Sequence, residues 1–265
     1  MTTPSARDVS VPAGRWVTEV IPTSFERVDT TDDDAAEWMS QRYRRPEGAF
    51  VRLNMVTTLT GSSAGADGSS ASISSRVDRL ILGAIRREAD VVVVGAETVR
   101  AEGSMLPKTA RMAIVTSSGD LGEGSLRRRD GRDAPPALIL CRPEDAARVE
   151  AAIGDAPAET VVVPGSPRAH DRGETPHGDA RLHPADIVHA LGARGLDRIV
   201  CEGGAGLATQ FVGAGVVDEV CVTVSPLLEP VHHPFLSLTA SVLTEVTGML
   251  VDDAGFSYRR LAIRR

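Results

Sequence analysis

The pattern of apolar and polar positions along the chain predicts short strands separated by helices. Residues 89–94 include four consecutive valines, a β-branched run typical of a strand buried in a parallel sheet. Residues 50–57 predict the first strand of the main sheet. Further strands are expected at residues 112–116, 137–141, 160–163, 199–202, 219–225 and 256–263.

Helices are expected between most of these strands. Ser74 or Ser75 would cap one whose apolar face carries Val77, Leu80, Ile81, Ala84 and Ile85. Others are expected at residues 143–153, 184–193 and 206–213. Alternating strands and helices predict a largely parallel sheet. The last strands have no obvious helix between them, which predicts an antiparallel edge.

The first 48 residues differ in composition from the rest. They are rich in Pro, Thr, Asp and Arg, and residues 31–34 would cap a helix over 35–40. We expect an N-terminal arm (1–48) laid on a main domain (49–265). Residues 119–136 and 164–181 are predicted to be polar insertions.

A glycine turn between a strand and a helix is the most informative segment. Residues 196–211 contain a short apolar strand, three glycines within positions 203–206, and then helical spacing. Glycines let a backbone approach a pyrophosphate, and the free N–H groups of the following helix attract its charge. Glu202, at the lip of the turn, could accept from a ligand hydroxyl. A tight turn without a ligand would show the same pattern.

A second turn of the same kind follows the valine run. Gly95 ends that strand, and residues 96–100 begin a short helix. In an open α/β sheet both glycine turns would lie at the carboxyl ends of the strands, where such folds place ligands.

Three motifs occur in an order that resembles one family. Residues 53–61 (LNMVTTLTG), 94–100 (VGAETVR) and 202–204 (EGG) resemble the reductase domain of the bifunctional riboflavin-biosynthesis deaminase/reductase. Residues 217–220 (VDEV) resemble the family's Val-Asp-Glu-Leu. The resemblance spans about residue 49 to the C-terminus. It implies an α/β, dihydrofolate-reductase-like fold, with a mixed, mostly parallel sheet, an antiparallel C-terminal edge and helices on both faces.

The resemblance also implies NADPH as cofactor, lying across the carboxyl ends of the strands. Thr116 and Ser117 would meet the adenosine ribose and its 2′-phosphate, but no arginine is obvious in that turn. The expected preference for NADPH over NADH is therefore implied by the resemblance to the family and by no residue of this turn. The remaining cofactor residues implied are Gly95, Glu97, Thr98, Glu202, Gly203, Gly204, Ala205, Gly206 and Leu207.

The family's reaction is hydride transfer to the sugar carbon of a phosphoribosylamino-pyrimidine. Asn54, Thr58, Thr60 and Ser74 are the substrate contacts implied. Family members typically read Ser-Leu-Asp-Gly where residues 58–61 read Thr-Leu-Thr-Gly, so Thr60 replaces a carboxylate by a hydroxyl. Thr60 and Glu202 are the candidate catalytic residues, and no firmer assignment follows.

Charge and composition narrow the class of protein. Lys+Arg 29 against Asp+Glu 36 gives a formal charge of −7, which argues against binding nucleic acid by general electrostatics. No apolar run reaches the ~20 residues that span a bilayer, and the start shows no secretory pattern. We expect a cytoplasmic protein with a small-molecule substrate. By analogy with the family we expect a homodimer, with residues 219–224 and 256–263 as its face.

The cysteines and histidines predict no metal site. Cys141, Cys201 and Cys221 are widely spaced in apolar segments, which is typical of reduced core residues. No Cys-x-x-Cys or His-x-Glu pairing occurs, and His232-His233 precedes a proline. The zinc deaminase half of the bifunctional proteins needs such spacing, so the chain is at most a stand-alone reductase.

Three hypotheses remain open. The first is an NADPH-dependent reductase of a pyrimidine-, pterin- or similar heterocyclic substrate, because the departures from the family lie on the substrate side. The second is the riboflavin-pathway reductase itself, with a divergent loop. The third is a catalytically silent dinucleotide-binding protein, for which Thr60 is the main support.

Overall fold

The chain is described from a computed structural model that covers residues 11–103, 106–122, 126, 135–164 and 181–264. In chain order its strands are β1 (Trp16–Ile21), β2 (Arg27–Asp29), β3 (Phe50–Thr58), β4 (Val91–Gly95), β5 (Arg111–Val115), β6 (Ala137–Cys141), β7 (Ala158–Val162), β8 (Arg198–Cys201), β9 (Glu219–Ser225), β10 (Thr244–Asp252) and β11 (Ser257–Ile263). Its helices are α1 (Ala35–Arg42), α2 (Arg76–Arg87), α3 (Ala96–Glu102), α4 (Ala146–Ile153), α5 (Pro184–Gly192) and α6 (Ala205–Gly213), with short 3-10 turns at Ser70–Ser72 and Pro143–Asp145.

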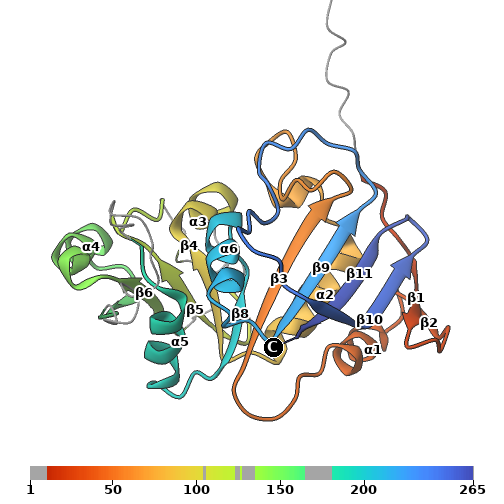
Figure 1. The fold of residues 1–265 in the computed structure, drawn as a ribbon, viewed down its shortest axis with the longest axis horizontal. Helices are drawn as coiled ribbons and strands as arrows, with labels where there is room; N and C mark the ends of the chain where they lie inside the picture. Colours follow the sequence, from red (N-terminus) through yellow and green to blue (C-terminus); the bar gives the residue numbers. More distant parts are fainter. Residues whose placement is uncertain (1–10, 104–105, 123–125, 127–134, 165–180, 265) are drawn as a thin grey trace, which may run out of the picture.

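All eleven strands form one sheet, in the order β2-β1-β10-β11-β9-β3-β8-β4-β5-β6-β7 (Figure 1). From β9 to β7 the neighbouring strands are parallel, whereas β11, β10, β1 and β2 add an antiparallel edge. The mixed sheet predicted from the sequence is therefore confirmed.

Helices cover both faces of the sheet, each over its own apolar core. One face packs against α1, α2, α3 and α4 through buried residues such as Met39, Ile81 and Val149. The other packs against α5 and α6 through residues such as Leu191 and Phe211. The valines of β4 alternate between the two cores, which explains why that strand is a continuous apolar run.

The N-terminal segment is more than an arm, because it contributes two strands to the antiparallel edge. β1 pairs with β10, and Val17 is fully buried in the core beneath α1. The sequence pattern did not predict β1, β2 and β10, because their alternation of apolar and polar residues is short or interrupted. The boundary between an arm and a main domain at residue 48 stays a prediction.

The expected helices are confirmed, with differences at their starts. Ser75 rather than Ser74 caps α2: its hydroxyl accepts from the backbone N–H of Asp78 at 3.1 Å. α1 begins after Asp34, whose side chain makes no capping hydrogen bond. The predicted insertions at residues 119–136 and 164–181 fall largely outside the described residues.

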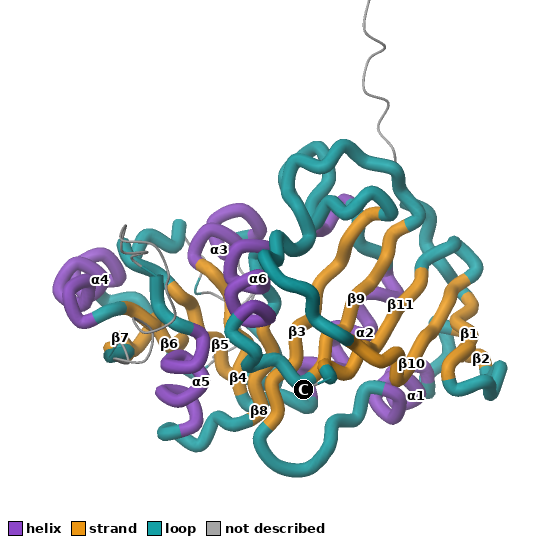
Figure 2. The backbone as a smooth tube through the Cα atoms, in the orientation of Figure 1, coloured by secondary structure: helices purple, strands orange, loops and turns teal. Residues whose placement is uncertain are grey.

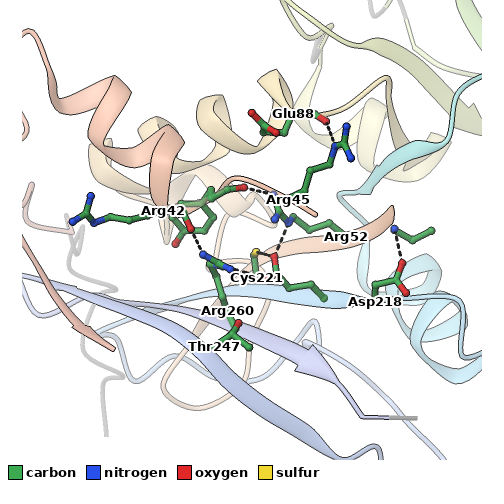
Figure 3. Close-up of polar contacts among 11 residues, drawn as sticks. Arg42, Arg45, Arg52, Glu88, Asp218, Cys221, Thr247 and Arg260 are labelled. Atoms are coloured by element: carbon green, nitrogen blue, oxygen red, sulfur yellow. Dashed lines mark hydrogen bonds and ion pairs between the residues drawn. The ribbon is translucent and has the colours of Figure 1, made fainter. Parts of the chain in front are cut away.

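Polar side chains join the strands at their amino-terminal ends (Figure 3). Arg52, almost fully buried on β3, donates to Glu219 of β9 at 2.7 Å and to the backbone carbonyl of Tyr43 at 2.9 Å. Arg260 of β11 donates to Glu219 at 3.3 Å and also to the carbonyl of Arg42. This network fixes α1 and three strands to one another.

The segment between β9 and β10 crosses the upper end of the sheet and descends beside α6 (Figure 2). Phe235, Leu236 and Val242 of this segment pack against the core beneath α5 and α6, and Ser237 donates its backbone N–H to Thr209 of α6.

The expectation that residues 219–224 present a face to a twin subunit is wrong for most of that segment, because β9 lies between β11 and β3 and Glu219 to Thr223 are buried. Within the described ranges, no helix is long and apolar enough to cross a membrane.

Candidate functional site

The two glycine turns meet at the carboxyl edge of the sheet. β4 and β8 are parallel neighbours, with Val93 opposite Cys201. Beyond that pair, Glu202 donates its backbone N–H to Val93 at 2.9 Å, and Gly95 donates to the carbonyl of Gly203 at 2.8 Å. The prediction that both turns lie at the same edge of the sheet is confirmed.

The turn at Gly203 and Gly204 leads directly into α6. Gly203 has φ +84°, a conformation that favours glycine, and the Gly203–Gly204 peptide is cis. A Cβ on Gly204 would lie 2.9 Å from the Thr98 hydroxyl, whereas a Cβ on Gly206 would meet nothing within 4 Å. No side chain caps α6, so its first N–H groups remain available to a ligand. Leu207 contributes only its backbone here, because its side chain is buried in the core.

The turn after β5 lies one strand further along the same edge. Thr116 is buried, and its hydroxyl accepts from the N–H groups of Ser118 (3.2 Å) and Gly119 (3.1 Å), so it shapes the turn. The side chain of Ser117 is exposed. Arg148 of α4 donates to the carbonyl of Ser117 from Nε (3.1 Å) and Nη2 (2.6 Å). The sequence shows no arginine within this turn, but the fold brings the guanidinium of Arg148 beside it.

Glu97 and Thr98 occupy the first turn of α3, next to Gly95. Glu97 is exposed, whereas Thr98 is half-buried and lies close to Gly204. The structure thus brings Gly95, Thr98 and Gly204 together and leaves Glu97 at the surface.

Glu202 is engaged in an ion pair. Its two carboxylate oxygens accept from Nε and Nη2 of Arg86 at 2.7 and 2.6 Å, and its side chain is only 5 % exposed. The pair joins the end of α2 to the glycine turn, and it raises the pKa of Arg86 against the opposing effect of burial. A free carboxylate at the lip of the turn, as expected from the sequence, is therefore not what the structure shows, and this counts against Glu202 as a catalyst.

Thr60 joins two loops. Its hydroxyl donates to the carbonyl of Glu229 and accepts from the N–H of Glu229 at 3.1 Å, and it lies 2.9 Å from the Thr58 hydroxyl. Thr58 is itself buried and accepts from the N–H of Ser62 at 3.0 Å. These contacts give both threonines a structural role in holding the first-strand loop, and they count against Thr60 as a catalytic group.

Asn54 and Ser74 lie on the α2 side of the sheet. Asn54 is half-buried on β3, opposite Cys221 of β9, and its side chain is on the same face as that of Arg52. Ser74 is also half-buried and donates its hydroxyl to Asp78 at 2.6 Å. The side chains of Asn54 and Ser74 are therefore partly exposed, and a ligand could contact them.

Sequence reasoning missed Asp78. Its other carboxylate oxygen accepts from the hydroxyl of Thr223 on β9 at 2.6 Å, and its side chain remains half-buried. Burial raises the pKa of this carboxyl, although Ser74 and Thr223 act in the opposite direction. An acidic residue three positions after a capping serine is a common feature of helix starts, so the sequence offered no signal of the contact with β9.

Asp78 belongs to a half-buried flank of α2. The buried residues of the helix are Val77, Ile81, Ala84 and Ile85. Asp78, Leu82 and Arg86 follow each other at intervals of four and all are half-buried. Because Arg86 reaches Glu202, this flank runs toward the glycine turns.

A family model described as the RibD C-terminal domain matches residues 49–228. The chain belongs to the RibD C-terminal domain family. The riboflavin biosynthesis protein RibD of Mycobacterium tuberculosis is 32% identical over 195 residues, which are 72% of this chain and 46% of that protein. The chain thus spans about half the length of the first curated relatives that it matches.

A relative of more similar length comes from Methanothermobacter thermautotrophicus. Its 2,5-diamino-6-ribosylamino-4(3H)-pyrimidinone 5′-phosphate reductase is 29% identical over 180 residues, 68% of this chain and 78% of that protein. The sequence motifs that resemble this family, at residues 53–61, 94–100, 202–204 and 217–220, all lie within the matched range 49–228.

Solved structures share the fold. A pyrimidine reductase-like protein from Corynebacterium diphtheriae superposes with a TM-score of 0.66 at 22% identity, covering 86% of this chain and 99% of that one. The riboflavin biosynthesis reductase Rib7 of Saccharomyces cerevisiae gives 0.62 at 14%, covering 88% and 100%. At these identities the likeness concerns the fold alone.

Proposed function

We propose that the protein is an NADPH-dependent reductase of a pyrimidine-, pterin- or similar small heterocyclic substrate, related to the riboflavin-pathway reductases. The observation that carries the proposal is the joining of the two glycine turns through the Gly95–Gly203 hydrogen bond. Backbone N–H groups, space for close approach and a helix start converge there, which is what a pyrophosphate requires. Family membership supports the reaction class.

The residues at this edge fit a dinucleotide. Gly203, Gly204, Ala205 and Gly206 would hold the pyrophosphate with backbone N–H groups, and Thr98 would add a hydroxyl. Ser117 and Arg148 would meet the adenosine ribose and its 2′-phosphate, which supports NADPH over NADH. Bound NADPH supplies the hydride, and the protein positions the reactants and excludes water.

The substrate would lie between the end of β3 and the half-buried flank of α2 that carries Asp78, Leu82 and Arg86. Asn54 and Ser74 would contact its polar edges, and Leu82 its apolar surface. The loop held by Thr58 and Thr60 would border the site without touching the reacting atoms.

The riboflavin-pathway reductase itself is the second candidate. The Methanothermobacter relative, which matches over 78% of its length, favours it. The two candidates differ in one measurement: efficient reduction of the phosphoribosylamino-pyrimidine by the wild type favours the pathway enzyme, whereas poor reduction of it together with efficient reduction of another heterocycle favours a changed substrate.

Calorimetric titration with NADPH and NADH, followed by a panel of pyrimidine and pterin substrates monitored by NADPH oxidation, tests the proposal. We expect micromolar or tighter binding of NADPH and turnover of at least one heterocycle. Binding without turnover of any substrate indicates the silent dinucleotide-binding protein, and no binding of either dinucleotide overturns the proposal.

The proposal includes a homodimer in the cytoplasm. Leu243, just before β10, and Val246 within it are 74% and 42% exposed, and we propose that they belong to the dimer face. Light scattering at micromolar concentration should give twice the 28.0 kDa of one chain. A monomer there, or a membrane-bound or secreted fraction in cells, would contradict this part.

A further inference from the structure

Glu102, the last residue of α3, is a carboxylate that the functional assignment so far leaves unused. One of its oxygens accepts from the backbone N–H of Ser70 at 2.9 Å, and the other accepts from the hydroxyl of Ser69 at 3.4 Å. Both serines belong to the loop between β3 and α2, residues 59–75. A negative charge at the C-terminal end of a helix is unfavourable for the helix itself. The position of Glu102 is therefore better explained by the loop that it binds than by α3.

The middle of the β3–α2 loop depends on Glu102 for its polar contacts with the rest of the protein. Ser63, near one end of the loop, is bonded to the segment between β9 and β10, and Ser75 at the other end caps α2. Among the described residues, every other hydrogen bond made by residues 65–73 has both partners inside that stretch. Apart from the packing of Ile73, which is buried, the Glu102 bonds are therefore what holds this stretch in place.

The other end of α3 lies at the proposed cofactor site. Gly95, directly before the helix, donates its N–H to the carbonyl of Gly203 at 2.8 Å. The hydroxyl of Thr98 would lie 2.9 Å from a Cβ on Gly204. At about 1.5 Å per residue, the seven residues of α3 span about 10 Å from the glycine turns to the β3–α2 loop. One short helix therefore contacts both the cofactor side and the substrate side of the site.

We propose that Glu102 is a positioning residue that couples cofactor binding to the order of the β3–α2 loop. The inference rests on the proposed function, in which NADPH occupies the glycine turns and the loop borders the substrate. A dinucleotide in those turns restricts the first turn of α3, and the helix transmits the restriction through Glu102 to Ser70. The loop is then more ordered in the NADPH complex than in the free protein, so the substrate binds preferentially to that complex. By linkage, a substrate that orders the loop raises the affinity for NADPH by the same factor.

The test is amide hydrogen exchange of residues 65–73, in the free protein and with saturating NADPH. Calorimetry on the same sample measures whether NADPH is bound. In the wild type we expect NADPH to slow exchange in this stretch by about 5-fold or more, which is the size of an ordinary coupling between two sites. Glu102→Ala should exchange faster without cofactor and should lose the effect of NADPH, while it still binds NADPH.

The matched control is Asp67→Asn. Asp67 accepts from the backbone N–H of Ser69 at 3.0 Å and from the hydroxyl of Ser72 at 2.7 Å, so it stabilises the loop from within. This variant should also exchange faster, but NADPH should still slow the exchange. In Glu102→Gln the amide oxygen can still accept from Ser70, so this conservative variant should keep most of the NADPH effect.

Ser70→Pro breaks the same contact from the loop side, and it keeps the proposal testable if Glu102→Ala folds poorly. Ser70 is the first residue of a 3-10 turn, where proline is tolerated, and Ser69 before it is extended, as a residue before proline should be. The variant lacks the N–H that Glu102 accepts, so NADPH should no longer slow exchange at Ile73. A full NADPH effect in either variant, or no effect in a wild type that binds NADPH, overturns this inference alone. Absence of NADPH binding overturns the proposed function together with it.

Discussion

Two buried arginine–glutamate pairs lie at opposite ends of the parallel strands and have opposite surroundings. Arg52–Glu219, at the amino-terminal ends, has side chains only 2% and 7% exposed and is bonded further to Tyr43 and Arg260 (Figure 3). Arg86–Glu202, at the carboxyl ends, leaves Arg86 17% exposed on the half-buried flank of α2. One pair is enclosed at the amino-terminal end of the sheet, whereas the other lies beside the candidate site at the carboxyl end. We therefore expect substitutions at the first pair to affect mainly stability and substitutions near the second to affect mainly ligand binding.

The largest effect should follow from breaking the closed pair. Glu219→Gln leaves the buried guanidinium of Arg52 without its charge partner, which should lower the free energy of unfolding by about 3–5 kcal/mol. Urea denaturation measures it. The control is Glu245→Gln, which removes the exposed pair with Arg264 and should cost at most about 1 kcal/mol. Equal losses in the two variants would contradict the assignment of the amino-terminal end to stability.

At the other end, Gly204→Asp should remove binding without unfolding the protein. Its carboxylate would lie against the cofactor pyrophosphate, and a like-charge contact of this kind costs several kcal/mol, about 100-fold or more in affinity for NADPH. Asp is also a favourable residue at a helix start, so α6 should persist, provided that Thr98 moves aside.

Calorimetry and a thermal melt of the same Gly204→Asp sample separate binding from folding. Gly213→Asp, at the far end of α6 where a Cβ meets nothing within 4 Å, is the control and should bind NADPH like the wild type. Retained affinity in Gly204→Asp would show that the pyrophosphate lies elsewhere.

Glu202→Gln should have an intermediate effect. The pair with Arg86 is bidentate, but the cation can reach water, so we expect a loss of about 1–3 kcal/mol in the free energy of unfolding, less than for Glu219→Gln. Because the pair fixes the glycine turn to α2, NADPH affinity should fall as well. A loss equal to that of Glu219→Gln, with unchanged affinity, would make the two pairs equivalent and remove the contrast between the ends.

The smallest effect concerns pH. A carboxyl whose pKa is raised on folding binds its proton more tightly in the native state, so its contribution to stability is present below the ordinary pKa of 3.8 and is lost as pH rises through the native pKa. Asp78→Asn cannot ionise and should not show this loss. Denaturation of both proteins between pH 4 and 8 should therefore show the variant gaining on the wild type as pH rises. A constant difference would mean that Asp78 is ionised throughout.

Local pattern was sufficient for the parallel half of the molecule. The valines of β4 and the glycine turns predicted strands, helices and a common ligand edge, because each signal lies within about fifteen residues and one strand packs between two helical layers. The antiparallel edge depends on pairings between distant segments. Val17 and Val28 are buried only because β10 and α1 come to lie beside them, and nothing in the short strands themselves indicates it.

The site divides in the same way. Gly95, Gly203 and Gly204 could be found from the sequence, because their conformation is local. The partners of Glu202, Thr60 and Asp78 could not: each is bonded to a residue more than a hundred positions away. The sequence shows which polar groups a side chain carries, but only the tertiary structure shows whether those groups already have hydrogen-bond partners within the protein.

The pairing of β1 with β10 has a consequence for synthesis. The N–H of Arg15 is bound by Asp253, 238 positions later, so β1 can pair with the nearby β2 early but its other edge stays unpaired until β10 has left the ribosome. Closing so long a loop is entropically costly and slow, whereas α2, β4 and β5 can assemble from adjacent segments. A nascent chain therefore exposes one unpaired edge of β1 until β10 is made, and chaperone capture or premature association is to be expected at that edge.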